Sequence, residues 1–197
     1  MVRGSMRSNS TQRLFVALVP SAATVAAVDA VVAPVRATRP GLRWVTPERW
    51  HVTLAFLGEV PDERRDDLEE RLGRTARRAV PLQLTIDGAG RFGDRTLWAR
   101  VGGDRERLRR LAEAAQAAAS RARIPVDRNR FRAHLTLAAA RPPGSVRDVA
   151  AELDPLLRNG PEETVTHMCL VRSLLGKGPG GTPRYEAVAT WRLGDAP

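Results

Sequence analysis

Two of the chain's three histidines stand in the same short pattern. Each is followed by threonine two residues later and by leucine three residues later, in the segments 51–54 (HVTL) and 134–137 (HLTL). Residues i and i+2 of a β-strand point to the same face. The pattern therefore predicts that His51 projects together with Thr53, and that His134 projects together with Thr136.

Two imidazoles that face one substrate could act as an acid and a base. Histidine holds or releases a proton near neutral pH, so one ring can deprotonate a nucleophile while the other protonates a leaving group. The threonine hydroxyls can donate hydrogen bonds to the non-bridging oxygens of a phosphate. For a single histidine, a half-buried strand residue with satisfied nitrogens is the better interpretation, but the duplication favours catalysis.

Strand parity also places an arginine beside each pair. Arg132, and less securely Arg49 at the start of its strand, lean toward the face of the histidines and could bind phosphate. Solvated arginines at strand ends are the alternative interpretation. The opposite face of the first motif is apolar and is expected to pack under helices; it carries Trp50, Val52, Leu54 and Phe56.

A zinc site is the rival interpretation of the histidines. It would need His51, His134 and His167 together, but the sequence has no HxH or HExxH pairing, and the repeated threonine would have no role. We therefore expect no metal and no other cofactor, and we expect His167 to lie on a strand.

Two further motifs are weak. The sequence has no G-x-S-x-G, and Cys169 lies in an apolar segment that favours a structural role. The glycine-rich segment 176–182 is not a P-loop, because Gly178 follows Lys177 where the motif needs serine or threonine. A hairpin tip, with Lys177 available to a nucleic-acid backbone, is the favoured interpretation.

Apolar runs and turn residues predict the elements that position these motifs. Strands are expected at 13–19, 51–57, 82–86, 96–101, 132–138, 165–172 and 185–193. Helices are expected from Ser21 to about Ala33, from Asp62 to about Arg78, from Asp104 to Ile124 and from Ser145 to Leu157. The second half of the chain repeats the plan of the first, which predicts an α+β fold of two lobes with two sheets.

The length and composition of the chain limit the possible fold and domain organisation. A chain of 197 residues with 43% hydrophobic residues should bury about 70% of its unfolded surface as one compact unit. We expect a tail or expression remnant at 1–12, one bilobal domain at 13–193 and a second tail at 194–197. With no apolar run long enough for a membrane helix and a single cysteine, the chain is expected to be cytoplasmic and monomeric.

The charge points to anionic partners. The chain has 32 basic and 22 acidic residues, a net charge of +10, and Lys177 is its only lysine. Arginine suits phosphate because its planar fork donates two parallel hydrogen bonds. An arginine-rich chain can equally reflect coding bias, so the charge alone does not select a nucleic-acid partner.

The two motifs resemble those of the two-histidine (2H) phosphoesterases, and within them the RNA 2',3'-cyclic phosphodiesterases, also called 2'-5' RNA ligases. The likeness covers about residues 13–193. It rests on the segments 13–18 (RLFVAL), 44–45 (WV), 51–60 (HVTLAFLGEV), 92–93 (FG), 97–98 (LW), 130–138 (RFRAHLTLA) and 170–173 (LVRS), and on Tyr185.

The resemblance implies a bilobal fold with pseudo-twofold symmetry and an active-site cleft between lobes. It also implies metal-independent hydrolysis of an RNA 2',3'-cyclic phosphate to a 2'-phosphate, with possible reverse ligation. Carried over by motif, His51 becomes the proton donor and His134 the proton acceptor. The family often has arginine five residues after its second histidine; here Ala139 stands there, and Arg141 is the substitute we expect to bind substrate.

Two other functions remain open at this point. One is a module that binds RNA or a nucleotide without turnover, although retention of both His-Thr pairs argues against it. The other is a phosphodiesterase for a small cyclic nucleotide metabolite. The expected partner is RNA or an oligonucleotide that ends in a 2',3'-cyclic phosphate.

Overall fold

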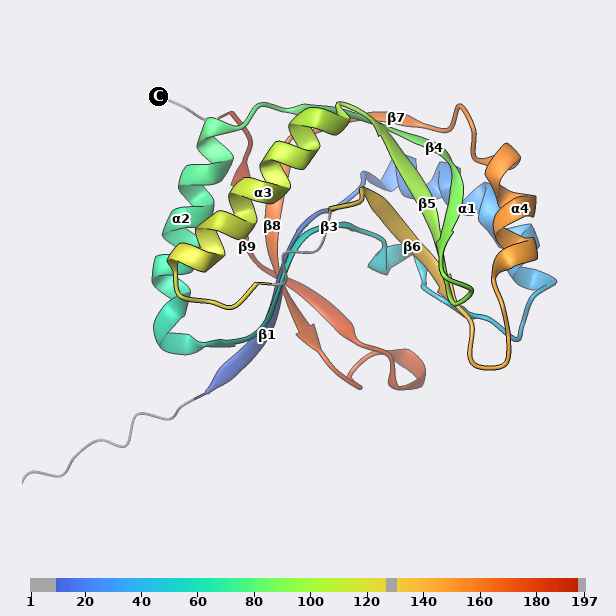
Figure 1. Ribbon diagram of the computed structural model, residues 1–197, viewed down its shortest axis with the longest axis horizontal. Coiled ribbons are helices and arrows are strands. Elements are labelled where there is room, and N and C mark those ends of the chain that lie inside the picture. Colours follow the sequence, from blue (N-terminus) through green and yellow to red (C-terminus); the bar gives the residue numbers. More distant parts are fainter. Residues whose placement is uncertain (1–9, 127–130, 195–197) are drawn as a thin grey trace, which may run out of the picture.

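The computed structural model describes residues 10–126 and 131–194, and it alternates strands with helices (Figure 1). The strands are β1 (Thr11–Leu18), β2 (Arg43–Trp44), β3 (Val52–Pro61), β4 (Leu82–Phe92), β5 (Thr96–Gly103), β6 (His134–Ala139), β7 (Glu162–Val165), β8 (His167–Leu174) and β9 (Arg184–Arg192). The α-helices are α1 (Ala22–Ala37), α2 (Arg65–Arg78), α3 (Arg105–Arg121) and α4 (Arg147–Leu156). Short 3₁₀ turns lie at Pro47–Arg49, Asp62–Arg64 and Pro179–Gly181.

The strands form two antiparallel halves that meet at one point. Their order is β7-β4-β5-β6-β3-β1-β8-β9, with β2 added beside β6. Strands β3 and β6 pair only through Val52 and Leu135, whereas every other neighbouring pair in this order shares at least four residue pairs. We call β1, β3, β8 and β9 the first lobe, and β2 with β4 to β7 the second lobe.

This arrangement confirms the predicted α+β fold with two antiparallel lobes. The two expected sheets are joined edge to edge, and the lobes do not correspond to the two halves of the chain. Helices α2 and α3 pack together against the first lobe, while α4 packs on β4 and contacts α1 (Figure 1). Helix α3 therefore follows a strand of the second lobe but covers the first.

Alternate residues of β1 separate two apolar clusters. Leu14, Val16 and Leu18 belong to the main core beneath the helices, whereas Phe15 and Ala17 belong to a smaller cluster with Cys169, Val171 and Tyr185. Since successive strand residues point to opposite faces, the smaller cluster lies on the face away from the helices. Cys169 thus packs in an apolar cluster, as its sequence context predicted.

The folded region begins earlier than the sequence indicated. Thr11 pairs with Pro61 at the start of β1, and Gln12 donates a hydrogen bond of 3.0 Å to the carboxylate of Asp62, so these residues belong to the sheet rather than to a tail. At the other end, Leu193 is buried. The remaining expected tail segments, 1–9 and 195–197, lie outside the described residues.

All four helices differ from their expected bounds: α2 starts three residues late, after the 3₁₀ turn Asp62–Arg64, and α4 is shorter at both ends. Helix α1 starts as predicted, because the Ser21 hydroxyl accepts a hydrogen bond from the backbone N–H of Thr24. It continues past Pro34 to Ala37, since the buried Val35 holds the last turn against the core. Helix α3 ends at Arg121, three residues before the expected Ile124. Within the described residues, no helix has the length and apolar character needed to cross a membrane.

Candidate active site

The two histidines flank the single pairing that joins the lobes. Val52 and Leu135 are directly opposite each other, and both side chains are buried in the main core. Their neighbours must therefore point to the other face. Continued in the same antiparallel register, His51 stands across from Thr136, and Thr53 stands across from His134. The structure thus brings the four predicted motif residues together.

The two imidazoles are held in the same way. His51 Nδ1 lies 2.8 Å from the carbonyl oxygen of Arg49, and His134 Nδ1 lies 2.6 Å from the carbonyl oxygen of Arg132. A carbonyl oxygen only accepts hydrogen bonds, so Nδ1 carries the proton in both rings. Each Nε2 is then left as the atom that can accept or deliver a proton.

Aromatic rings from other strands surround both histidines. The ring of His51 lies 4.7 Å from that of Phe15 and 5.3 Å, edge on, from that of Tyr185. The ring of His134 lies 4.9 Å, edge on, from that of Phe92 and 6.1 Å from that of Trp98. These contacts, added to the Nδ1 hydrogen bonds, limit rotation of both imidazoles.

The flanking arginines stack on the same aromatic rings. The guanidinium carbon of Arg49 lies 5.1 Å above the ring centre of Tyr185, and that of Arg132 lies 5.9 Å from the ring centre of Phe92. Cation–π contact at this distance holds each guanidinium against its ring. Arg49 Nε is buried without a hydrogen-bond partner among the described residues.

Burial lowers the pKa of both histidines, because it disfavours the charged imidazolium. The hydrogen bonds to the carbonyls of Arg49 and Arg132 oppose this effect. The positive charge of His134 lowers the pKa of His51 further. The two rings are therefore within electrostatic reach of each other, and the neutral forms are favoured in the free protein.

The ring of Trp98 lies directly on a glycine. A Cβ added to Gly90 would collide with the indole carbons of Trp98, and the two residues pair across β4 and β5. The absence of a side chain at Gly90 lets the indole lie against the β4 backbone, with its ring centre 6.1 Å from that of His134. Sequence reasoning placed Trp98 on a middle strand but did not find this contact.

The repeated leucine of the two motifs marks a bulge in both strands. In β3, Leu54 is an extra residue between the partners of Ala17 and Val16. In β6, Leu137 is an extra residue between the partners of Trp98 and Leu97. A bulge shifts the alternation of faces by one residue. The position five residues after each histidine is thereby turned onto the histidine face.

Comparison with known proteins now decides the family. The family model described as the 2'-5' RNA ligase superfamily matches residues 20–177. The chain belongs to this superfamily. A relative from Thermus thermophilus named RNA 2',3'-cyclic phosphodiesterase is 34% identical over 180 residues, which cover 85% of each chain.

A Geobacillus stearothermophilus relative with the same name is 30% identical over 168 residues, which cover 80% of this chain and 50% of the relative. The chain thus spans about half the length of that protein. Among solved structures of the fold, TT0787 of Thermus thermophilus matches with a TM-score of 0.74 and 31% identity, over 92% of this chain and 98% of that one. Escherichia coli LigT complexed with 3'-AMP matches with a TM-score of 0.67 and 27% identity, over 93% and 98%.

In this member of the superfamily, the first bulge corrects one expectation. Phe56 was expected on the packing face, but it pairs with Phe15 and lies on the histidine face. In a regular strand Phe56 would share a face with Val52 and Leu54, but the bulge at Leu54 turns Phe56 to the opposite face. Phe56 leaves 62% of its surface exposed, and its ring centre lies 6.0 Å from that of Phe15.

The second bulge turns Ala139, rather than Ala138, toward the site. Arg43 of β2 pairs directly with Ala139, and directly paired residues of antiparallel strands share a face. Arg43 therefore lies on the histidine face, beside Ala139, the position at which the resemblance led us to expect an arginine. Arg141, the expected substitute, is exposed two residues beyond the end of β6.

The remaining candidates lie apart from this group. His167 begins β8, is exposed, and has its Nδ1 2.8 Å from the hydroxyl of Thr166. Within residues 10–126 and 131–194, no three or more His, Cys, Asp and Glu side chains gather as they would around a metal ion. The glycine-rich segment with Lys177 connects β8 to β9, as a hairpin tip should.

Proposed function

We propose that this protein hydrolyses the 2',3'-cyclic phosphate ends of RNA to a 2'-phosphate and a free 3'-hydroxyl. One observation carries the proposal: two opposed imidazoles, each with Nδ1 on a carbonyl two residues earlier, flank the single link between lobes. The names of the relatives from Thermus and Geobacillus support the substrate.

The reaction needs one base and one acid. His134 Nε2 accepts a proton from a water molecule as the water oxygen bonds to phosphorus. The bond from phosphorus to the 3' oxygen breaks, and His51 delivers its Nε2 proton to that oxygen. The ring opens, the phosphate stays on the 2' oxygen, and the protonation states of the two rings are exchanged. The order of these roles follows the resemblance of the two motifs to the family.

The threonines and arginines supply hydrogen bonds to the phosphate. Thr53 and Thr136 are partly exposed beside the imidazoles, and neither hydroxyl is engaged with another described residue. They donate to the non-bridging oxygens as charge develops there. We assign the anchoring of the phosphate to Arg43 and Arg132, whose positions face the site, rather than to Arg141.

Phe56 provides a surface for the base of the terminal nucleotide. An aromatic ring that stays exposed on the site face can stack on a base without selecting its identity. The neighbouring Phe15 supports the Phe56 ring from the strand beside it. This arrangement favours an RNA end over a bare cyclic phosphate, because the bare phosphate has no base to stack.

The decisive experiment uses an oligonucleotide that ends in a 2',3'-cyclic phosphate. Incubation with the purified protein should yield a 2'-phosphate, identified by ³¹P NMR and by chromatography against authentic 2'- and 3'-phosphate standards. Exhaustive chelation should leave the rate unchanged, since the proposed acid and base are both imidazoles. Binding without turnover, hydrolysis of mononucleotides alone, or a 3'-phosphate product would each contradict the proposal.

The assignment of Arg43 has a matched control. Arg43→Ala removes a charge-assisted hydrogen bond, worth about 1.5–3 kcal/mol, and should raise the KM for a cyclic mononucleotide by roughly tenfold or more. Arg141→Ala removes the same charge from beyond the end of β6 and should leave KM unchanged. The reverse result would return the anchoring role to Arg141.

A further inference from the structure

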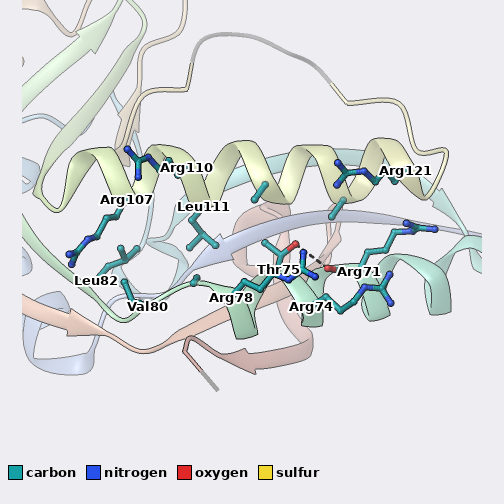
Figure 2. Close-up of a pocket in the computed structure, with 13 residues that line it drawn as sticks. Arg71, Arg74, Thr75, Arg78, Val80, Leu82, Arg107, Arg110, Leu111 and Arg121 are labelled. Atoms are coloured by element: carbon teal, nitrogen blue, oxygen red, sulfur yellow. Dashed lines mark hydrogen bonds between the residues drawn. The ribbon is translucent and has the colours of Figure 1, made fainter. Parts of the chain in front are cut away.

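A groove lined by arginine lies between α2 and α3, away from the histidines (Figure 2). Its volume is about 470 Å³, which falls in the range of ligand sites. Among the residues that the structure describes, six arginines and no carboxylate line it, three arginines from each helix: Arg71, Arg74, Arg78, Arg107, Arg110 and Arg121. Figure 2 shows Arg107 and Arg110 toward one end, and Arg71, Arg74 and Arg121 toward the other.

The floor of this arginine groove is apolar. It is formed by residues of the α2–β4 connection, the first residue of β4 and α3, namely Ala79, Val80, Leu82, Leu111, Ala114 and Ala118, with Thr75 of α2 as the one polar neighbour besides the arginines. From Arg107 to Arg121, α3 extends for about 21 Å at 1.5 Å per residue. The groove is therefore an elongated apolar strip with cationic rims, long enough for several nucleotides.

The guanidinium groups remain able to bind a further anion. Arg71 contacts Asp67 through Nε at 2.8 Å, and Arg110 contacts Glu106 through Nε at 3.2 Å. Both keep their terminal nitrogens for another partner, because guanidinium has five N–H donors. Four of the six arginines form ion pairs with carboxylates outside the groove lining, namely Arg71, Arg74, Arg107 and Arg110. Among the residues that the structure describes, Arg78 and Arg121 form none.

The groove is separate from the candidate active site. Leu72 of α2 and Leu111 of α3 pack in the main core with Leu14, whereas His51 contacts Phe15. Leu14 and Phe15 are successive residues of β1 and point to opposite faces. Helices α2 and α3 and the ring of His51 therefore lie on opposite faces of the first lobe.

We propose that the arginine groove binds single-stranded RNA, with phosphates on the two arginine rims and bases against the apolar floor. Rows of arginine match a chain of regularly spaced phosphates, and an apolar strip between them accepts the faces of bases of any sequence. An acidic peptide would satisfy the rims but would leave the floor without an apolar partner. The inference rests on the proposed function only in taking RNA as the nucleic acid.

The test measures binding of a fluorescent single-stranded RNA with an ordinary 3'-hydroxyl, so that no cyclic phosphate is needed. The double variant Arg78→Ala/Arg110→Ala should weaken binding at least tenfold. It should also make the plot of log affinity against log salt shallower by about 1.4, at about 0.7 for each lost phosphate contact. Hydrolysis of a cyclic mononucleotide should be unchanged, which also shows that the variant is folded.

The matched control is Arg39→Ala/Arg147→Ala, which removes two exposed, ion-paired arginines around the second lobe. It should leave the affinity and the salt slope near the parent values. Equal losses of RNA affinity in both double variants would show that only the net charge matters and would contradict the proposal. Displacement of the RNA by polyglutamate at equal charge would identify an acidic peptide as the occupant. Absence of any hydrolysis by the parent protein would contradict the proposed function, while the binding result would still decide the groove.

Discussion

At the scale of single residues, the arginine two positions before each histidine acts through both its backbone carbonyl and its side chain. The backbone carbonyls of Arg49 and Arg132 orient the imidazoles, while their side chains stack on Tyr185 and Phe92. The carbonyl contribution survives any substitution that keeps the strand. Loss of the side chain should therefore affect substrate binding more than the orientation of the imidazole.

Removal of either imidazole should abolish most of the turnover. We expect His51→Ala and His134→Ala each to lower kcat by roughly 10²- to 10⁴-fold, the usual range for a positioned acid or base. Both histidines are only half-buried, so both variants should keep the parent's circular dichroism spectrum. Full activity in either variant, measured in single turnover, would remove that histidine from the mechanism.

The lowered pKa values determine the pH dependence. The proposed mechanism needs neutral His134 and protonated His51, and both pKa values lie below the usual 6.5 in the free protein. As pH rises through the lowered pKa of His51, the proton donor is lost, so kcat/KM should be greatest below 6.5. The anionic phosphate raises the pKa of His51 in the complex, so the maximum of kcat should lie at higher pH.

Both profiles should be measured on the same cyclic mononucleotide. Because two interacting imidazoles titrate as a pair, the limbs report the pair rather than single residues. An alkaline limb of kcat/KM centred well above 6.5 would show that burial does not control His51. Coincident maxima for kcat and kcat/KM would show that the phosphate has no effect on the proton donor.

At the scale of elements, the flat contact between β4 and β5 supports the second histidine. Gly90→Ala places a methyl group where the Trp98 indole lies, and overpacking of this kind costs about 1–3 kcal/mol. The variant should unfold at lower urea concentration. It should also lose part of its kcat, because the new methyl group displaces Trp98 from its position next to His134. Gly41→Ala is the control, since a Cβ there meets no atom within 4 Å. An unchanged kcat for Gly90→Ala would mean that Trp98 does not position the imidazole.

Sequence patterns predicted seven of the strands and the paired motifs because alternation and turn residues act locally, but they missed the short strands β2 and β7. The same patterns were wrong about Phe56 and did not find Arg43. In both cases a bulge at the motif's leucine shifts the alternation, and leucine is equally suited to a regular buried strand. The repeated leucine is visible in the sequence, but only the strand register shows that it forms a bulge.

The aromatic surroundings of the histidines could be predicted only in part. Phe15, Phe92 and Tyr185 lie in segments that resemble family strands, yet their contacts with His51 and His134 depend on which strands become neighbours. Pairing of β1 with β8 joins residues more than 150 positions apart. No local pattern contains that information.

At the scale of the whole molecule, the net charge of +10 should make hydrolysis of long substrates sensitive to salt. For an oligonucleotide, log kcat/KM should fall with log salt by about 0.7 for each phosphate contacted. A cyclic mononucleotide presents only the reacting phosphate and should show a much shallower slope. Equal slopes for both substrates would attribute the excess arginine to coding bias and favour a small cyclic nucleotide as substrate.

The interleaved lobes also govern the order in which a nascent chain can fold. The strands of the second lobe have all been synthesised once β7 ends at Val165, but β1 gains its neighbour β8 only from residues 167–174. Throughout translation of the intervening chain, one edge of β1 has no strand to pair with. Open edges recruit other chains, so ribosomes that stall after β7 should release fragments that need a chaperone, whereas a chain released after β9 should not.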